Sequence, residues 1–232
     1  MKILAFETTS HVASVAVLSD EMLLGEFTIN HPKTHSQKLM PMLIMLLESL
    51  ELNVKDFDYF AVSSGPGSFT GVRIGVSTVK ALAQPHNIPV IPVSSLEAMG
   101  QPFIGFEGLI CPIMDARKNE VYTALYRWQD GVLVMVEPDQ AIAPDLWLEQ
   151  LAKLPENILL VGDALPKYAQ NYQDVLGDRL IVAPEAFNRQ RASSVAQSAL
   201  SKTHLAVSYN VVPTEYLRKS EAETTYDAKH GK

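Results

Sequence analysis

The stretch from residue 63 to residue 75, Ser-Ser-Gly-Pro-Gly-Ser-Phe-Thr-Gly-Val-Arg-Ile-Gly, constrains the fold more than any other part of the chain. The residues just before it, 59–62, are apolar and favour a strand. The glycines and the proline then force a turn, and Ser68 or Thr70 can cap a following helix by accepting a hydrogen bond from a free backbone N–H group. Gly71 and Gly75 lie one helical turn apart, so this face of the helix has no side chains and another backbone can approach it closely.

Two interpretations of this turn stay open. Backbone amides at a helix N-terminus attract anions, which would make the turn a phosphate loop. However, a Walker A motif requires Lys and then Ser or Thr after its second glycine, whereas Val72 and Arg73 follow Gly71. The dinucleotide-binding pattern requires its third glycine one position earlier. These mismatches favour the other interpretation, a tight strand-to-helix turn with a closely packed helix.

Composition narrows the class of protein. The chain has 232 residues, 47% of them hydrophobic, which is enough to bury a core in one large domain or two small ones. No apolar run is long enough to span a bilayer, and no signal peptide is recognisable, so we expect a cytoplasmic protein without a membrane partner. Cys111 is the single cysteine, which excludes an internal disulfide and fits the cytosol. The net charge of −7 argues against tight binding of nucleic acid by this chain alone.

The pattern of predicted elements occurs twice. In each half of the chain, three strands of a meander precede an alternation of helices and strands. The predicted strands of the two meanders cover residues 3–6, 12–18, 22–29, 109–114, 121–128 and 132–136. A turn is expected at residues 115–119, a hairpin turn at Asp130-Gly131, a further strand at 158–161, and a helix at 194–204 capped by Ser193.

This duplicated pattern is what an α/β protein with two actin/hexokinase-like (ribonuclease H-like, ASKHA) domains, each a mixed sheet with helices, would produce. Glycine and proline cluster between Met99 and Gly108, where a domain boundary is expected. The predicted division is an N-terminal domain at 1–104, a C-terminal domain at 105–220 and a frayed tail at 221–232.

Several blocks of the sequence resemble the bacterial TsaB (YeaZ) family. The glycine-rich stretch looks like the signature of that family, and further similar blocks occur at residues 2–10, 88–97, 114–122 and 216–218. The resemblance is dense before Ser95 and thin between Gln140 and Pro213. It implies an ASKHA fold and a role in making N6-threonylcarbamoyladenosine in tRNA.

The resemblance also implies partners. It indicates a non-catalytic subunit that pairs with a catalytic paralogue of the same fold (TsaD type) and works with a small ATPase (TsaE type). The assembly would transfer a threonylcarbamoyl group to the adenosine beside the anticodon, with tRNA reached only through the complex and a homodimer possible for the free chain. The alternative hypothesis is an active small-molecule kinase or ATPase of the same fold, and a metallopeptidase is the third.

No metal or other cofactor is expected. His31 and His35 have a spacing that can share a metal on a helix, but Pro32 disfavours helical geometry at His31, and no nearby carboxylate or cysteine completes the site. The resemblance places Ser95 and Met99 where catalytic relatives carry a His-x-x-x-His metal pair, and hydroxyl and thioether groups are poor ligands for such a cation.

Nucleotide binding by this chain alone is also not expected. On the fold that the resemblance implies, residues 7–10 lie at the first phosphate loop of actin-like ATPases, and Asp115 and Ala116 lie at the second. A carboxylate at each loop could hold Mg²⁺ through water. The simpler interpretation is that Glu7 and Asp115 cap turns. Neither loop has the glycines that let a backbone approach phosphates closely.

A partner interface is predicted on two helices, residues 36–52 and Phe69–Ala83. The first is apolar around most of its circumference, more than its own domain is expected to cover, and methionines suit such contacts. The second helix has the bare glycine face and a polar edge that contains Arg73. The predicted interface residues are Leu39, Met42, Met45, Leu46, Gly71, Arg73 and Gly75. The sequence leaves open which stripe of the first helix faces outward, and Met42, Met45 and Leu46 are the preferred outward positions.

Overall fold

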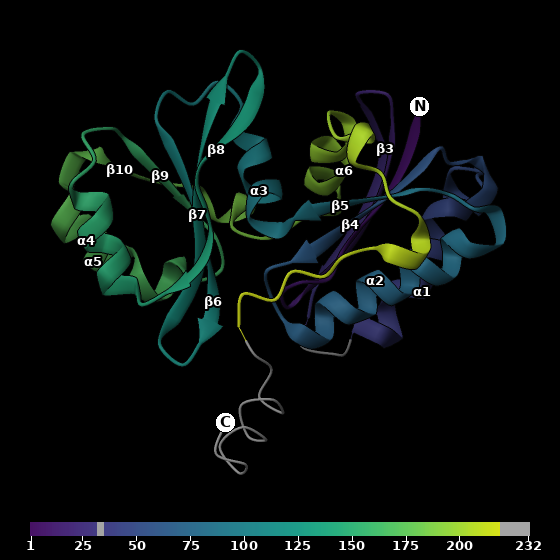
Figure 1. The fold of residues 1–232 in the computed structure, drawn as a ribbon, viewed down its shortest axis with the longest axis horizontal. Helices are drawn as coiled ribbons and strands as arrows, with labels where there is room; N and C mark the ends of the chain where they lie inside the picture. Colours follow the sequence, from purple (N-terminus) through teal and green to yellow (C-terminus); the bar gives the residue numbers. More distant parts are fainter. Residues whose placement is uncertain (32–34, 219–232) are drawn as a thin grey trace, which may run out of the picture.

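The computed structural model describes residues 1–31 and 35–218 as an α/β protein with two five-stranded mixed sheets (Figure 1). The strands of the first sheet, in chain order, are β1 (Lys2–Glu7), β2 (Val12–Ser19), β3 (Met22–Asn30), β4 (Tyr59–Gly65) and β5 (Val90–Ser94). Those of the second are β6 (Leu109–Arg117), β7 (Glu120–Gln129), β8 (Val132–Ile142), β9 (Ile158–Val161) and β10 (Leu180–Val182). The helices are α1 (His35–Ser49), α2 (Phe69–Ala83), α3 (Ser95–Gly100), α4 (Pro144–Ala152), α5 (Leu165–Leu176) and α6 (Ala192–Leu200).

The two sheets share one topology. The spatial order is β3-β2-β1-β4-β5 in the first sheet and β8-β7-β6-β9-β10 in the second. In each sheet the first three strands pair antiparallel, and the last two strands run parallel to the first strand of the meander. The predicted repetition of a meander followed by parallel strands, and with it the ASKHA fold class, is confirmed.

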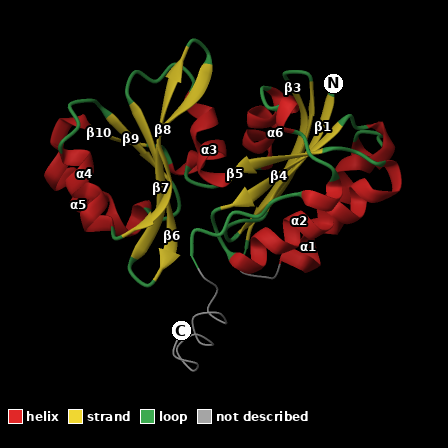
Figure 2. Ribbon diagram, in the orientation of Figure 1, coloured by secondary structure: helices red, strands yellow, loops and turns green. Residues whose placement is uncertain are grey.

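Helices cover both faces of each sheet (Figure 2). Along β1, Leu4 and Phe6 pack with the helices α1 and α2, whereas Ile3 and Ala5 pack with α6. A strand buried on both faces is continuously apolar, as the sequence of β1 is. In the second sheet, α4 and α5 lie over the outer face, and α3 lies over the inner face. Because α3 also contacts α6, the two inner layers meet at the centre of the molecule.

Helix α6 belongs spatially to the first sheet, although it follows the second sheet in the sequence. Its first turn is held by two side chains of that sheet: the Ser14 hydroxyl accepts from Ala192 N at 3.0 Å, and the Glu26 carboxylate accepts from Ser193 N at 2.9 Å. The predicted helix at 194–204 with Ser193 as its cap is therefore corrected to Ala192–Leu200 with Arg191 at the N-cap. The predicted domain limits, 1–104 and 105–220, stay a prediction, and the tail at 221–232 lies outside the described residues.

Helix α1 ends earlier than its apolar pattern suggests. The predicted range, 36–52, extends three residues beyond Ser49. Glu51 has a left-handed backbone (φ 54°), which ends the helix, and Leu52 N then donates to Leu47 O. Among the described helices, none combines the length and the apolar character needed to cross a membrane.

Candidate functional site

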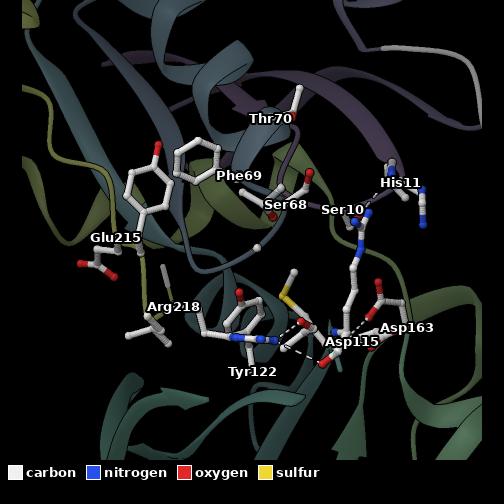
Figure 3. Close-up of a pocket in the computed structure, with 18 of the residues that line it drawn as sticks. Ser10, His11, Ser68, Phe69, Thr70, Asp115, Tyr122, Asp163, Glu215 and Arg218 are labelled. Atoms are coloured by element: carbon white, nitrogen blue, oxygen red, sulfur yellow. Dashed lines mark hydrogen bonds between the residues drawn. The ribbon is translucent and has the colours of Figure 1, made fainter. Parts of the chain in front are cut away.

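A cleft of about 770 Å³ lies between the two sheets (Figure 3). Most of its lining comes from the turn after β1, the start of α2, the β6–β7 hairpin and residues 215–218, and single residues, among them Asp163 and Arg189, complete it. The labelled residues of Figure 3 show that polar side chains from both halves of the molecule point into this space. The cleft is the candidate site because it brings together the two segments that the sequence singled out as phosphate-loop positions.

The Glu7 side chain stabilises the turn after β1 through hydrogen bonds. Its carboxylate is fully buried and accepts from Thr9 N at 2.5 Å, from the Thr9 hydroxyl at 2.6 Å and from the Ser63 hydroxyl of β4. Burial raises the pKa of Glu7 above its ordinary value, although these hydrogen bonds favour the ionised form. Glu7 therefore caps a turn, as the simpler interpretation predicted, and its carboxylate does not line the cleft.

The glycine-rich stretch packs α2 directly onto this turn. A Cβ atom at Gly67 would lie 2.4 Å from Thr9 O, and one at Gly71 would lie 2.0 Å from Thr8 O. Thr8 Oγ1 in turn donates to Gly71 O at 2.7 Å. Ser68 is the N-cap of α2, and its hydroxyl accepts from Gly71 N at 3.3 Å. These contacts confirm the tight turn with a closely packed helix, in which the glycines admit the chain's own backbone.

Two carboxylates of the second half lie on the opposite side of the cleft. Asp115 accepts from Arg117 N at 2.8 Å and so caps the start of the β6–β7 turn, as predicted. Asp163, which follows β9, accepts from Asp115 N at 3.1 Å. Burial is the main cause that raises the pKa of Asp163, and the hydrogen bond from Asp115 N opposes it. Both carboxylates thus hold backbone in place at the edge of the cleft.

Ser95 and Met99 make internal contacts. Both are buried on α3. Ser95 donates to Pro66 O of the glycine-rich turn, and the Met99 sulfur accepts from Gln190 Nε2 at 3.6 Å. Across residues 1–31 and 35–218, no three His, Cys, Asp or Glu side chains are grouped so that they could hold a metal ion. The His31–His35 hypothesis cannot be placed, since residues 32–34 lie outside the described part of the chain.

The predicted interface residues do not share one surface. Leu39, Met42 and Leu46 are buried in the core between α1 and the first sheet, and Gly71 and Gly75 are covered by Thr8. Met45 and Arg73 are exposed, and the outward face of α1 also carries Met40 and Ile44. The preference for Met42 and Leu46 as outward positions is therefore wrong, because both side chains face the sheet. The interface itself stays a prediction.

Several cleft residues were not singled out as site residues from the sequence. Asp163, Arg189 and Tyr216 line the cleft, and each lies beyond the segments that carried the strongest signals. The short block 216–218 was the one local indication, since it resembled a family block. Nothing in the local pattern near Asp163 or Arg189 marks them, because their position depends on how the second sheet faces the first.

The comparisons with known proteins agree with one another. The family described as "TsaD: tRNA N6-adenosine threonylcarbamoyltransferase" matches residues 23–226. The chain is 36% identical over 226 residues to "tRNA threonylcarbamoyladenosine biosynthesis protein TsaB" of Bacillus subtilis (strain 168), across 97% of this chain and 98% of that protein. It is 32% identical over 192 residues to the protein of the same name from Escherichia coli (strain K12), across 80% and 83% of the two chains.

Solved structures support the same assignment of fold. The structure described as "YeaZ from Pseudomonas aeruginosa" matches with a TM-score of 0.77 and 25% identity, covering 93% of this chain and 99% of that one. An ROK hexokinase from Thermus thermophilus matches with a TM-score of 0.51 and 12% identity, covering 87% of this chain and 100% of that one, a likeness of fold alone.

Proposed function

Because this chain belongs to the TsaB family of tRNA threonylcarbamoyladenosine biosynthesis proteins, we propose that it serves that pathway as an accessory subunit without an active site of its own. The chain takes part in N6-threonylcarbamoyladenosine formation. In the proposed assembly it pairs with a catalytic paralogue of the TsaD type, and a small ATPase of the TsaE type and the tRNA join through the complex. Family membership favours this function over a small-molecule kinase.

The contacts of the cleft support the accessory role. The carboxylates of Glu7 and Asp115, which could have held Mg²⁺, accept hydrogen bonds from Thr9 N and Arg117 N. Ser95 and Met99 are buried and engaged within the chain. These polar groups stabilise the turns around the cleft, and chemistry on the threonylcarbamoyl group is assigned to the paralogue.

The proposed docking surface is the outward face of α1, which carries Met40, Ile44 and Met45. Met45 is 56% exposed, and Ile44 is 50% exposed. The neighbouring helix α2 carries Arg73, an exposed cation of the predicted interface. A compact apolar centre with a charged rim is the arrangement in which a few side chains supply most of the binding free energy. We therefore place the TsaD-type partner on this face.

A reconstituted reaction tests the role and the surface together. The catalytic paralogue and the small ATPase are assayed for tRNA modification with wild-type chain, with Met45→Glu, or with Met135→Glu. Met135 lies on β8 of the second sheet and is 49% exposed, so it controls for a new surface charge. We expect Met45→Glu to weaken binding to the paralogue at least tenfold, about 1.4 kcal/mol, and to lower modification in proportion.

Met135→Glu should behave as wild type in both measurements. Equal affinity and activity for all three chains would place the interface elsewhere. Modification by this chain without the paralogue would refute the accessory role.

A further inference from the structure

After α6 the chain returns along the first sheet and then reaches the second (Figure 1). We call residues 206–218 the C-terminal strap. Val207 pairs with Val90 of β5 as an antiparallel bridge, and the Lys80 ammonium of α2 donates to Asn210 O at 3.4 Å. Val212 is buried in the core beneath α2. The strap is thus attached to the first half of the molecule along most of its length.

Within the described residues, the strap is attached to the first half for the last time at residues 215 and 216. Glu215 N donates to Ser64 O of β4 at 2.8 Å. The Tyr216 ring stacks on Phe69 at 4.6 Å between centroids, and Arg73 Nε donates to the Tyr216 hydroxyl at 3.3 Å. The Arg73 guanidinium also lies 3.8 Å from the centre of the Phe69 ring. Cation–π and aromatic contacts of this kind hold Tyr216 against the start of α2.

Two residues later the strap is attached to the second half. Arg218 Nη1 donates to Ala116 O at 2.6 Å and to Arg117 O at 3.2 Å, and it lies 3.1 Å from a Glu120 carboxylate oxygen (Figure 3). All three acceptors belong to the β6–β7 hairpin. Hydrogen bonds from a charged guanidinium are stronger than those between neutral groups.

The hairpin that receives Arg218 has an unusual backbone. Arg117, Lys118 and Asn119 have φ angles of 61°, 49° and 59°, three consecutive left-handed residues of which none is glycine. Residues other than glycine disfavour the left-handed backbone conformation and keep it where surrounding contacts fix the backbone. The bonds from Arg218 to the carbonyl groups of residues 116 and 117 are contacts of that kind.

We infer that residues 215–218 form an interdomain clamp that limits how far the cleft opens. Tyr216 anchors the clamp on the first half, and Arg218 anchors it on the second. Two residues of extended chain span at most about 7 Å, so the sheets cannot separate at this end of the cleft while both anchors are in place. A ligand or partner segment that needs a wider cleft must release one anchor, and release of Arg218 also frees the hairpin.

Pulsed electron-spin distance measurements test the clamp in the full chain. Spin labels are attached through Lys55→Cys in the first half and Glu149→Cys in the second, both at exposed positions, while the native Cys111 is buried. In this background, Arg218→Ala should broaden the distance distribution toward longer values. Amide hydrogen exchange in residues 115–120 should accelerate at least tenfold.

Arg179→Ala is the matched control. Arg179 also donates to backbone carbonyls, those of Ala152 and Leu154, but entirely within the second half. It should leave the interdomain distances unchanged. The contact of Ser94 with Asp139 and the packing of α3 on α6 also join the halves, so loss of Arg218 should leave the chain folded.

Tyr216→Ala removes the aromatic anchor on the first half. It provides the test of the clamp if the Arg218→Ala chain fails to fold. Because the bond from Glu215 N to Ser64 O remains, it should broaden the distances less than Arg218→Ala does, while the hairpin keeps its slow exchange. The double variant should open no further than Arg218→Ala alone, because both changes weaken the same link. Unchanged distances in the folded Arg218→Ala or Tyr216→Ala chain, or additive opening in the double variant, would overturn the clamp.

Discussion

The ionisation of the Glu7 side chain should change the free energy of unfolding of the chain. Burial raises its pKa above the ordinary value of 4.5, so the folded chain binds this proton more tightly than the unfolded chain does. Stability contributed by the group is therefore greatest below about pH 4.5 and falls as the pH rises through the folded-state pKa. Each pKa unit corresponds to about 1.4 kcal/mol.

The Glu7→Gln variant isolates this effect. We expect the free energy of unfolding of wild type, minus that of the variant, to decrease as the pH rises from about 4.5. The raised pKa values of Asp163 and Glu215 cancel in this difference. Urea unfolding across this pH range measures it, with Glu21→Gln at an exposed turn as the control. A difference that grows with pH would contradict the assignment.

Among the elements, helix α2 contacts the turn after β1 closely because Gly71 has no side chain. A Cβ atom at Gly71 would lie 2.0 Å from Thr8 O, and this acceptor is backbone that cannot rotate away. We expect Gly71→Ala to lower the free energy of unfolding by about 2–3 kcal/mol. An ordinary Gly→Ala change in a helix would instead stabilise by about 1 kcal/mol.

Urea unfolding of Gly71→Ala and of Ser77→Ala, an exposed position on the same helix, makes the comparison. The control should change stability by no more than about 0.5 kcal/mol. A Gly71→Ala chain as stable as wild type would show that α2 can move away from Thr8.

At the scale of the whole molecule, the net charge of −7 limits what the isolated chain can bind. Phosphate contacts by Lys and Arg supply most non-specific affinity for nucleic acid. Arg117, Lys118 and Arg189 line the cleft, but Asp115 and Asp163 lie among them. We therefore expect this chain alone to bind free tRNA with a Kd weaker than about 10 μM at physiological salt, and to lose most of that affinity as salt rises.

Fluorescence anisotropy of labelled tRNA, titrated with the isolated chain at two salt concentrations, measures this affinity. The complete complex provides the positive control. Submicromolar binding by the isolated chain at physiological salt would mean that a local basic surface outweighs the net charge.

Local sequence patterns were enough to predict several of the elements. Continuous apolar runs predicted the strands β1, β6 and β9, which are buried on both faces, and the glycine-rich stretch predicted the tight turn before α2. The order of these elements indicated a duplicated fold, which the resemblance to the TsaB family also implied. Local patterns carry this information because backbone conformation and burial period are set by neighbours within a few residues.

Which side chains face outward, and which distant segments meet, became clear from the three-dimensional arrangement. Helix α1 is apolar around most of its circumference, so its sequence could not show that Met42 is buried and Met45 exposed. Helix α6 lies on the first sheet because Ser14 and Glu26, more than 160 residues away, hold its first turn. Arg218 likewise meets the β6–β7 hairpin across about a hundred residues. Such pairings depend on how the two sheets and their helices come together, and no pattern confined to one segment records that arrangement.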